Sequence, residues 1–280
     1  RWILSRLMRT IQEVDGQLEQ FKFNEPVNTL YRFFWNDLCD WYLEWVKPRM
    51  NDSQARPVAQ HVLAFVLDQT IRLMHPFVPF ITEGIFQALN EIAARRALNG
   101  IADAGESASV MAAGWPVAVE SLVDEEVEQS IEKLQNVIRC IREIRNQYTV
   151  ASSRELAVSV RVSGDSAAVL QANLNLIRSL CTVSEIALGA DLEKPDTAAA
   201  GVVEDMQIFV HDVIDQAAER QRLEKQKAFL ENGIRPLEAK LGNPNFLSRA
   251  KPEVVEQSRQ KLADLTEQLE TVNKLLRELQ

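Results

Sequence analysis

Cysteine is scarce in this sequence, and long apolar runs are missing. Cys39, Cys140 and Cys181 lie far apart and form no CxxC pair, so neither a disulfide framework nor a zinc site is indicated. No apolar stretch approaches the roughly 20 residues that a membrane-spanning helix needs. Arg6 and Arg9 interrupt the first helical pattern, which excludes a signal peptide. We therefore expect a soluble, cytoplasmic protein in a reducing compartment, with no membrane partner.

Catalytic motifs are also missing. The sequence contains no GxxxxGK phosphate loop, no GxGxxG, no HExxH and no GxSxG. His61, His75 and His211 stand alone, and the carboxylates are scattered. We interpret His75, directly before Pro76, as a hydrogen-bonded residue at a helix end rather than a metal ligand. The sequence therefore predicts no catalytic, cofactor-binding or metal-binding residue.

Positive charge is low overall and unevenly distributed. The formal net charge is −9 over 280 residues, which argues against a chain-wide attraction to nucleic-acid phosphates. From Ala217 to Gln280 there are 12 Lys and Arg against 10 Asp and Glu, a balance of +2, so residues 1–216 carry −11. Local basic faces remain compatible with RNA, whereas DNA is not an expected partner.

Helical spacing dominates residues 1–150. Apolar residues at three- and four-residue steps predict five helices, at 2–23, 24–48, 54–74, 81–95 and 122–148. Pro48 is expected to end the second of them. The small and turn-rich residues of 97–116 indicate a surface loop. Helices joined by short links predict a bundle.

The pattern changes at Glu155. Apolar and polar residues alternate from Leu156 to Val162, which predicts a strand. Further apolar segments predict a helix at 169–180 and strands at 183–188 and 201–210. Residues 151–214 are therefore expected to form a small α+β module.

From Asp215 the sequence is helical to its end. Apolar residues at 262, 265, 269, 272, 276 and 279 step by 3, 4, 3, 4 and 3, as in the seam of a coiled coil. The segment GNPNFLSRAKP, 242–252, interrupts the pattern, so the two helices are expected to fold back as an antiparallel hairpin. Gly233 and Pro236 are expected to bend the first helix.

The predicted fold class is mainly α. It consists of a helical bundle at 1–150, the small α+β module at 151–214, and an antiparallel two-helix coiled coil at 215–280. At 1.5 Å per residue, such a hairpin reaches roughly 35 to 40 Å. An element this thin has little core of its own, which suits a projecting arm better than an independent domain.

Aromatic residues crowd the second predicted helix, at Tyr31, Phe33, Phe34, Trp35, Trp41, Tyr42 and Trp45. Two interpretations stay open. The rings form the core of the bundle, as is usual for a helix that is apolar nearly all round. Alternatively, one or two of them project and stack on unpaired RNA bases, with Lys47 and Arg49 beside them.

Arginines recur on the last bundle helix, at Arg139, Arg142 and Arg145. They are interpreted either as a solvated face with ion pairs to residues such as Glu143, or as contacts to phosphates.

Several segments resemble a known family. RWILSRL, LYRFFWNDLCDWYLEWVKPRM and LMHPFVPFITEGIFQAL resemble the α-helical anticodon-binding domain of the class I aminoacyl-tRNA synthetases for isoleucine, leucine and valine. The ending RLEKQKAFLENGIRPLEAKLGNPNFLSRAKPEVVEQSRQKL resembles the C-terminal coiled-coil arm of bacterial valyl-tRNA synthetases. The resemblance covers nearly the whole chain and is weakest in the α+β module.

The resemblance implies binding of tRNA(Val) by a monomer, without chemistry in this chain. In the family, valine is activated with ATP and Mg and transferred to tRNA, and mischarged threonyl-tRNA is hydrolysed. The HIGH and KMSKS signatures of that chemistry are absent here. Arg1 opens the chain inside a periodic apolar segment, so we expect a fragment that is inactive by itself, with ATP bound in an upstream domain.

Residue types and the resemblance together predict two contact sets. The anticodon loop is expected to contact Phe34, Trp35, Lys47, Arg49, Arg139, Arg142 and Arg145. The outer corner of the tRNA, its elbow, is expected to contact Arg222, Lys225, Lys240, Asn245, Phe246, Arg249 and Lys251.

Two alternatives stay open. The chain is a structural bundle whose coiled-coil tail joins two copies, or it is the matching region of an isoleucyl- or leucyl-tRNA synthetase. The latter shares the bundle and is expected to lack the arm.

Overall fold

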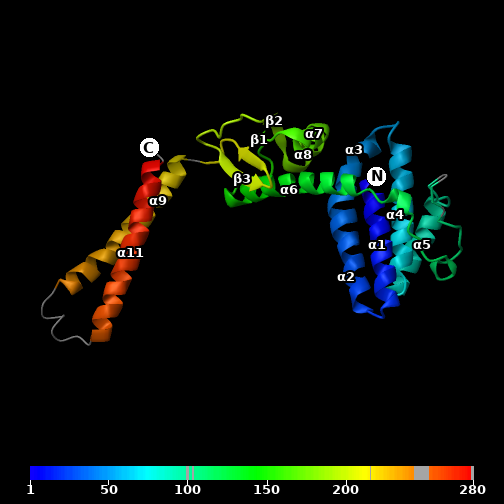
Figure 1. The fold of residues 1–280 in the computed structure, drawn as a ribbon, viewed down its shortest axis with the longest axis horizontal. Coiled ribbons are helices and arrows are strands. Elements are labelled where there is room, and N and C mark those ends of the chain that lie inside the picture. The colour runs from blue at the N-terminus through cyan, green and yellow to red at the C-terminus, as the bar shows by residue number, and fades with distance from the viewer. Residues whose placement is uncertain (99–100, 103, 215, 243–251, 279–280) are drawn as a thin grey trace. The chain divides into compact units, whose positions relative to one another are not determined.

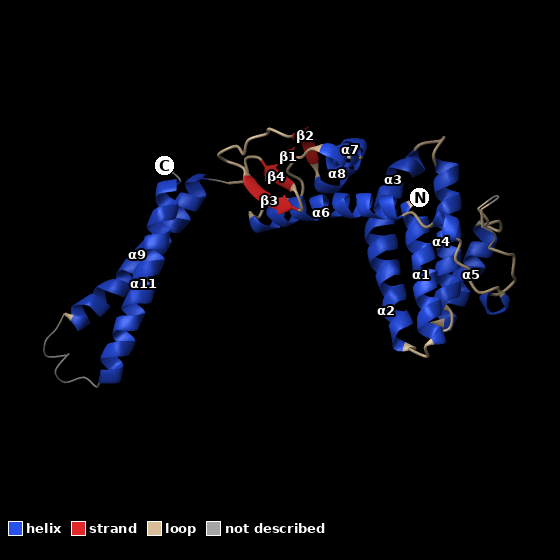
Figure 2. Ribbon diagram, in the orientation of Figure 1, coloured by secondary structure: helices blue, strands red, loops and turns tan. Residues whose placement is uncertain are grey.

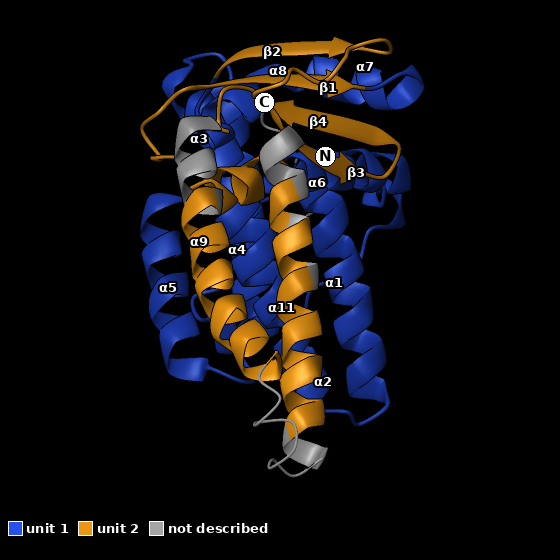
Figure 3. Cartoon of the chain, turned by 90° about the vertical axis from the view of Figure 1, so that its left-hand side faces the viewer, with its two compact units in different colours: residues 1–139, 162–183 blue, residues 140–161, 184–280 orange. Residues whose placement is uncertain are grey.

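A computed structural model describes residues 1–98, 101–102, 104–214, 216–242 and 252–278. Within these ranges the chain is mostly helical, with one four-stranded sheet (Figure 2). It divides into two compact units, one of residues 1–139 and 162–183 and the other of residues 140–161 and 184–280 (Figure 3). This confirms the predicted fold class, mainly α with a small α+β module.

The first unit is built on a helical bundle (Figure 1). Its elements are α1 (Trp2–Glu19), α2 (Asn24–Arg32), the π-helix η1 (Phe33–Tyr42), α3 (Leu43–Asn51), α4 (Arg56–Met74), α5 (Pro79–Ile92), the short 3₁₀ helices η2 (Val110–Ala112) and η3 (Glu120–Leu122), α7 (Gly164–Ala172) and α8 (Leu174–Cys181). Leu7, Met8 and Ile11 of α1 are fully buried. This apolar face gives the bundle its core, as the periodicity predicted.

The helix expected to end at Pro48 continues to Asn51, so that prediction was wrong. Pro48 lies inside α3. A proline removes one backbone hydrogen bond, and only three more residues of the helix follow it. The sequence also gave no sign that Phe33–Tyr42 is π-helical, a geometry that is rare in proteins.

The helix α6 (Glu125–Gln147) passes from the first unit into the second. In the first unit its buried residues include Leu134 and Ile138, and in the second Ile141 and Ile144. The predicted isoleucine stripe is thus a buried stripe along one helix.

The sheet of the second unit has the order β2-β1-β4-β3. Its strands are β1 (Leu156–Arg161), β2 (Val183–Gly189), β3 (Ala199–Val203) and β4 (Met206–Val210). Strand β4 is antiparallel to β1, with Val158 opposite Val210, and to β3, with Val203 opposite Met206.

Two boundaries in this region differ from the prediction. Residues 201–210 form a hairpin instead of one strand, because Glu204 takes a left-handed conformation (φ 51°) that reverses the chain. The helix expected at 169–180 is two helices, α7 and α8, which meet at Asn173. The Asn173 side chain donates a hydrogen bond to the Val169 carbonyl at 2.8 Å, which closes the first of them.

The last two helices, α9 (Gln216–Leu241) and α11 (Pro252–Glu278), lie side by side (Figure 1). Leu230 of α9 packs on Val272 of α11, with Leu265 and Leu269 beside them. Gly233, one turn beyond Leu230, lies against Leu265, one heptad before Val272. A later residue of α9 thus contacts an earlier residue of α11. The two helices are therefore antiparallel, which confirms the predicted hairpin.

Candidate nucleic-acid interface

Most of the aromatic cluster belongs to the bundle core. Phe33, Trp41 and Tyr42 are 1%, 6% and 9% exposed. Burial raises the pKa of the Tyr42 hydroxyl. The Trp45 ring lies 4.9 Å from that of Trp2 and 5.6 Å from that of Trp41. The first interpretation of the cluster therefore holds for these residues.

Two rings of the cluster project from it. Tyr31 is 61% exposed and Trp35 is 48% exposed, and their ring centroids are 6.2 Å apart. Phe34 is half-buried and meets Trp35 edge-on at 5.5 Å. Tyr31 and Trp35, here called the exposed aromatic pair, lie four residues apart on continuous helix. Exposed rings of this kind are what stacking on unpaired bases requires.

The predicted cations of α3 are on the surface. Lys47 is exposed, and its Nζ lies 2.5 and 2.6 Å from the two carboxylate oxygens of Glu44. Arg49 is exposed and helps to line a pocket of about 670 Å³, which Tyr42 and Trp45 also line. The Trp45 Nε1 atom is buried in this region and makes no hydrogen bond.

The arginines of α6 do not form one exposed row. Arg139 is exposed, and its guanidinium lies 5.4 Å above the Trp41 ring. Arg142 is exposed as well. Arg145 is only 8% exposed and donates hydrogen bonds to the carbonyls of Ala151 (2.7 Å) and Arg154 (2.9 Å). In this position Arg145 fastens the turn after α6 and is not presented to a phosphate.

The predicted arm residues are only partly described. Lys225 and Lys240 are exposed on α9. Arg222 also lies in α9, but its side chain is outside the described residues. Four further residues of the predicted elbow set lie outside the described residues altogether: Asn245, Phe246, Arg249 and Lys251.

A buried charge cluster in the first unit was missed by the sequence analysis. Asp68 is fully buried and forms ion pairs with Arg72 at 2.7 Å and Arg96 at 2.8 Å. The Phe86 ring lies 4.7 Å from the Arg96 guanidinium and 5.5 Å from that of Arg72. Arg72 also donates to the Gly105 carbonyl at 2.9 Å. The cluster therefore fixes the long loop after α5 to the bundle.

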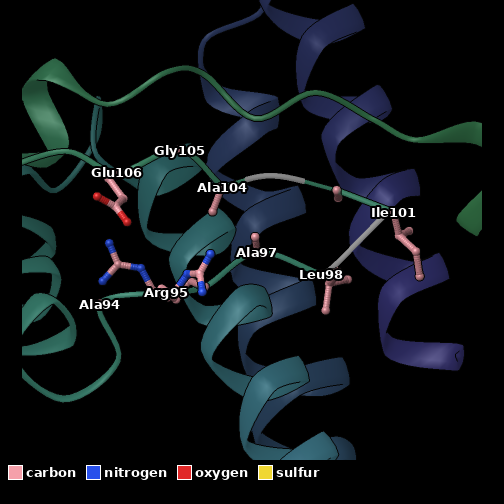
Figure 4. Close-up of a pocket in the computed structure, with 10 residues that line it drawn as sticks. Ala94, Arg95, Ala97, Leu98, Ile101, Ala104, Gly105 and Glu106 are labelled. Carbon is pink, nitrogen blue, oxygen red and sulfur yellow. The ribbon is translucent and has the colours of Figure 1, made fainter.

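A pocket of about 560 Å³, whose lining is shown in Figure 4, shares Arg96 and Gly105 with this cluster. Arg95, Arg96 and Glu106 contribute its charged groups. Because Arg96 is paired with Asp68, Arg95 and Glu106 supply the charge that is not committed to the buried cluster. Opposite charges of this kind do not make an anion site.

A second network joins α1 to α6 and η1. Glu128 accepts hydrogen bonds from Ser5, from Arg6 at 3.1 Å and from Arg9 at 2.8 Å. Burial opposes ionisation of Glu128, but these donors outweigh it and lower the pKa of the carboxyl. Asp37 pairs with Arg6 at 3.0 Å, yet burial raises the Asp37 pKa. The network is structural, since its charges satisfy one another.

Two histidines and two cysteines of the described residues have defined local surroundings. His75 caps the end of α4, with its Nδ1 2.8 Å from Thr82 Oγ1, which confirms its interpretation as a hydrogen-bonded helix-end residue. His211 Nε2 lies 2.8 Å from Ser159 Oγ. Burial raises the pKa of the Cys39 and Cys140 thiols, so both are poor nucleophiles. Among the described residues, no three His, Cys, Asp or Glu side chains gather as a metal site.

None of the helices in the described ranges combines the length and the apolar composition needed to cross a bilayer.

Two family models match the chain. The one described as the anticodon-binding domain of tRNA ligase matches residues 1–160, and the one described as the valyl tRNA synthetase tRNA binding arm matches residues 215–280. The two matches agree with the resemblance drawn from the sequence.

Similar curated proteins are valine–tRNA ligases. That of Rhodopirellula baltica is 36% identical over all of this chain and 27% of its own length. That of Thermotoga maritima is 34% identical over all of this chain and 30% of its own length. That of Geobacter sulfurreducens is 37% identical over 95% of this chain and 29% of its own length. The chain thus spans less than a third of each of these relatives.

Proposed function

The chain belongs to the family of anticodon-binding domains of tRNA ligases, and we propose that it is the tRNA-binding part of a valine–tRNA ligase. One observation carries the proposal. A bundle of the anticodon-binding family is followed, in the same chain, by a hairpin that matches the tRNA-binding arm of valyl-tRNA synthetases. The arm distinguishes this proposal from an isoleucyl- or leucyl-tRNA synthetase.

In this proposal the chain binds tRNA(Val) as a cytoplasmic monomer and performs no chemistry. Its contribution is to hold a large RNA in one orientation. Binding energy gained at two distant points of a tRNA fixes the position of its acceptor end, which makes a later reaction there effectively unimolecular. A helical bundle and a two-helix hairpin would supply two such contact surfaces.

The bundle would receive the anticodon loop. The exposed aromatic pair supports this, because Trp35 and Tyr31 offer ring faces to unstacked bases. Phe34, Lys47, Arg49, Arg139 and Arg142 remain in the proposed contact set, since each is at least partly exposed. Arg145 enters it only as a residue that positions the end of α6.

The arm would contact the elbow of the tRNA. Lys225 and Lys240 support this proposal because both are exposed on α9. The other proposed contacts are Arg222, Asn245, Phe246, Arg249 and Lys251. Cations at these positions would bind backbone phosphates, which position a protein on RNA without reading its sequence.

Activation of valine with ATP and Mg²⁺, and editing of threonyl-tRNA, belong in this proposal to the part of the relatives that the chain does not span. The described residues hold no group of three potential metal ligands, and Arg72 and Arg96 are both ion-paired with the buried Asp68. We therefore derive no ATP-dependent step from the residues of this chain.

Fluorescence anisotropy with labelled tRNA(Val) tests the proposal. We expect salt-dependent binding that weakens when the anticodon bases are exchanged and when a different tRNA is used. Absence of binding at low salt would contradict the proposal. Light scattering separates the alternative: a dimeric mass would favour the structural module with a coiled-coil tail, and a monomeric mass the tRNA-binding part.

A further inference from the structure

Helix α9 carries a large aromatic side chain on its surface. Phe229 is 76% exposed, although its neighbour Leu230 is buried at 3% in the hairpin seam. A coiled coil needs no aromatic residue outside its seam for its own packing. The exposed ring is therefore available for a contact outside the hairpin.

The residues around Phe229 on the helix surface are basic or neutral. At about 100° per residue, the described side chains within about 60° of Phe229 come from Lys225, Gln226, Asn232, Gly233, Pro236 and Lys240. No Asp or Glu occupies this sector. We call it the Phe229 face.

Three glutamates of α9 lie on the opposite side. Glu224, Glu231 and Glu238 follow one another at seven-residue steps, about 140° to 180° from Phe229. Lys227 lies on that side as well, with its Nζ 4.0 Å from Glu231. Arg235, about 120° from Phe229, lies there too, so that side of the helix is mixed in charge, whereas the Phe229 face carries no carboxylate.

This separation decides which side of α9 suits RNA. Phosphates would be repelled by the row of glutamates and attracted by Lys225. An exposed aromatic ring beside cations is the arrangement that binds nucleic acid by stacking and phosphate contact. A protein partner with an apolar surface would use the ring but would gain nothing from the lysine.

We propose that the Phe229 face is the surface of the arm that contacts folded RNA, with Phe229 stacking on an exposed base and Lys225 bound to a nearby phosphate. The inference rests on the proposed function and adds to it a side of the helix and a stacking residue. Neither residue type alone identifies the face. The identification depends on the ring, the lysine and the missing carboxylates occurring together.

The experiment compares four variants of the full chain by anisotropy with tRNA(Val) over a range of salt. Phe229→Ala removes the ring, and Phe229→Trp keeps a stacking surface. Lys225→Ala and Lys227→Ala form a matched pair, because the two lysines are two residues apart on one helix but point to opposite sides. Circular dichroism checks that every variant keeps its helix content.

Loss of the ring is expected to weaken binding about 5- to 100-fold, the range for one stacked base, with the salt dependence unchanged. Phe229→Trp is expected to bind as well as the wild type. Lys225→Ala is expected to reduce the slope of log affinity against log salt by about one, and Lys227→Ala to leave it unchanged.

Three outcomes would overturn the inference. If Phe229→Ala binds like the wild type while exchanged anticodon bases still weaken binding, the inference fails and the proposed function stands. If the two lysine variants behave alike, charge on α9 acts without a preferred face. If the wild type binds no tRNA at low salt, the proposed function and the inference fail together.

Discussion

Gly201 of β3 packs directly over the Cys140 sulfur of α6, so closely that a β-carbon at residue 201 would overlap Sγ. The same β-carbon would lie 3.2 Å from Ile144 Cδ1. Strand and helix therefore approach to a distance that only glycine permits. Gly201→Ala is expected to destabilise the chain by about 1–3 kcal/mol in urea denaturation, because the helix or strand must shift to make room.

A second substitution identifies the clash as the cause. Removing the sulfur with Cys140→Ala in the Gly201→Ala background is expected to restore part of the lost stability, as neighbouring sites couple. Gly84→Ala is the control, since nothing lies within 4 Å of a β-carbon there. It is expected to stabilise α5 by about 0.5–1 kcal/mol. Equal losses at both glycines would contradict this explanation.

Asp68→Ala is expected to destabilise the first unit by about 3–5 kcal/mol, because it leaves Arg72 and Arg96 buried without their counter-charge. Urea denaturation measures the loss. Glu44→Ala, which breaks the exposed pair with Lys47, is the matched control and is expected to cost less than about 1 kcal/mol. Similar losses of unfolding free energy for the two variants would show that the ion pairs of Asp68 do not stabilise the first unit.

The sequence predicts some of these features and not others, for physical reasons. Apolar periodicity marks Leu7, Ile11 and Leu230 as core because burial of a repeating face is a local property of a helix. Asp68 has one local partner, Arg72, four residues along the same helix. Its second partner is not local: Arg96 is 28 residues away, and the sequence shows only that both are charged. The close contact between Gly201 and Cys140 cannot be predicted from the sequence either, because it depends on how β3 and α6 pack in three dimensions.

The aromatic cluster shows the same limit within the candidate site. Periodicity distinguishes an apolar helix from a polar one, but it did not separate buried Phe33 and Trp41 from exposed Tyr31 and Trp35. The π-helical turns of η1 change which side each residue occupies, because a π-helix has a different number of residues per turn. The burial of Arg145 could not be foreseen for a related reason, because it depends on the turn to which the side chain donates its hydrogen bonds.

Acid is expected to weaken the link between α1 and α6 through Glu128. Its carboxyl has a pKa below the ordinary 4.5, so its contribution to stability is complete above that value and is lost as the pH falls through the lower, folded-state pKa. Glu128→Gln is therefore expected to cost about 1–3 kcal/mol at pH 7 and progressively less in acid. Chemical denaturation at several pH values measures the difference.

Asp37 provides the contrast, because burial raises its pKa and its effect on stability has the opposite sign. Ionised Asp37 opposes folding, so its contribution improves as the pH falls through its raised pKa. Because Glu128 adds to the raised Asp37 pKa, the comparison is made in an Asp37→Asn background, where the Asp37 contribution is removed from both proteins. If the difference in unfolding free energy that Glu128→Gln makes in this background does not decrease in acid, the lowered pKa is wrongly assigned to Glu128.

Trp35→Ala is expected to weaken binding of an anticodon stem-loop about 5- to 100-fold, as loss of one stacked base would. Phe80→Ala is the matched control: Phe80 is 94% exposed in the same unit but belongs to α5, away from the exposed aromatic pair in sequence. Its removal is expected to leave affinity unchanged. Equal effects at Trp35 and Phe80 would argue against the proposed anticodon surface.

Leu230→Ala is expected to open the hairpin without unfolding the bundle. Leu230 is 3% exposed and packs on Val272, also 3% exposed. Replacing a buried leucine by alanine costs about 2–5 kcal/mol. This is a large fraction of the stability that a hairpin of two helices can have. Hydrogen exchange is expected to show faster exchange of α9 and α11 amides, with those of α1 still protected.

Gln226→Ala is the control, because Gln226 is exposed on the same helix and does not belong to the apolar cluster between α9 and α11. It is expected to leave exchange unchanged. If the arm is the second contact point for tRNA, Leu230→Ala also lowers affinity, since the Phe229 face then lies on a helix without a partner. Loss of α1 protection in the same variant would mean that arm and bundle unfold as one unit, and the hairpin would then not be an independently ordered arm.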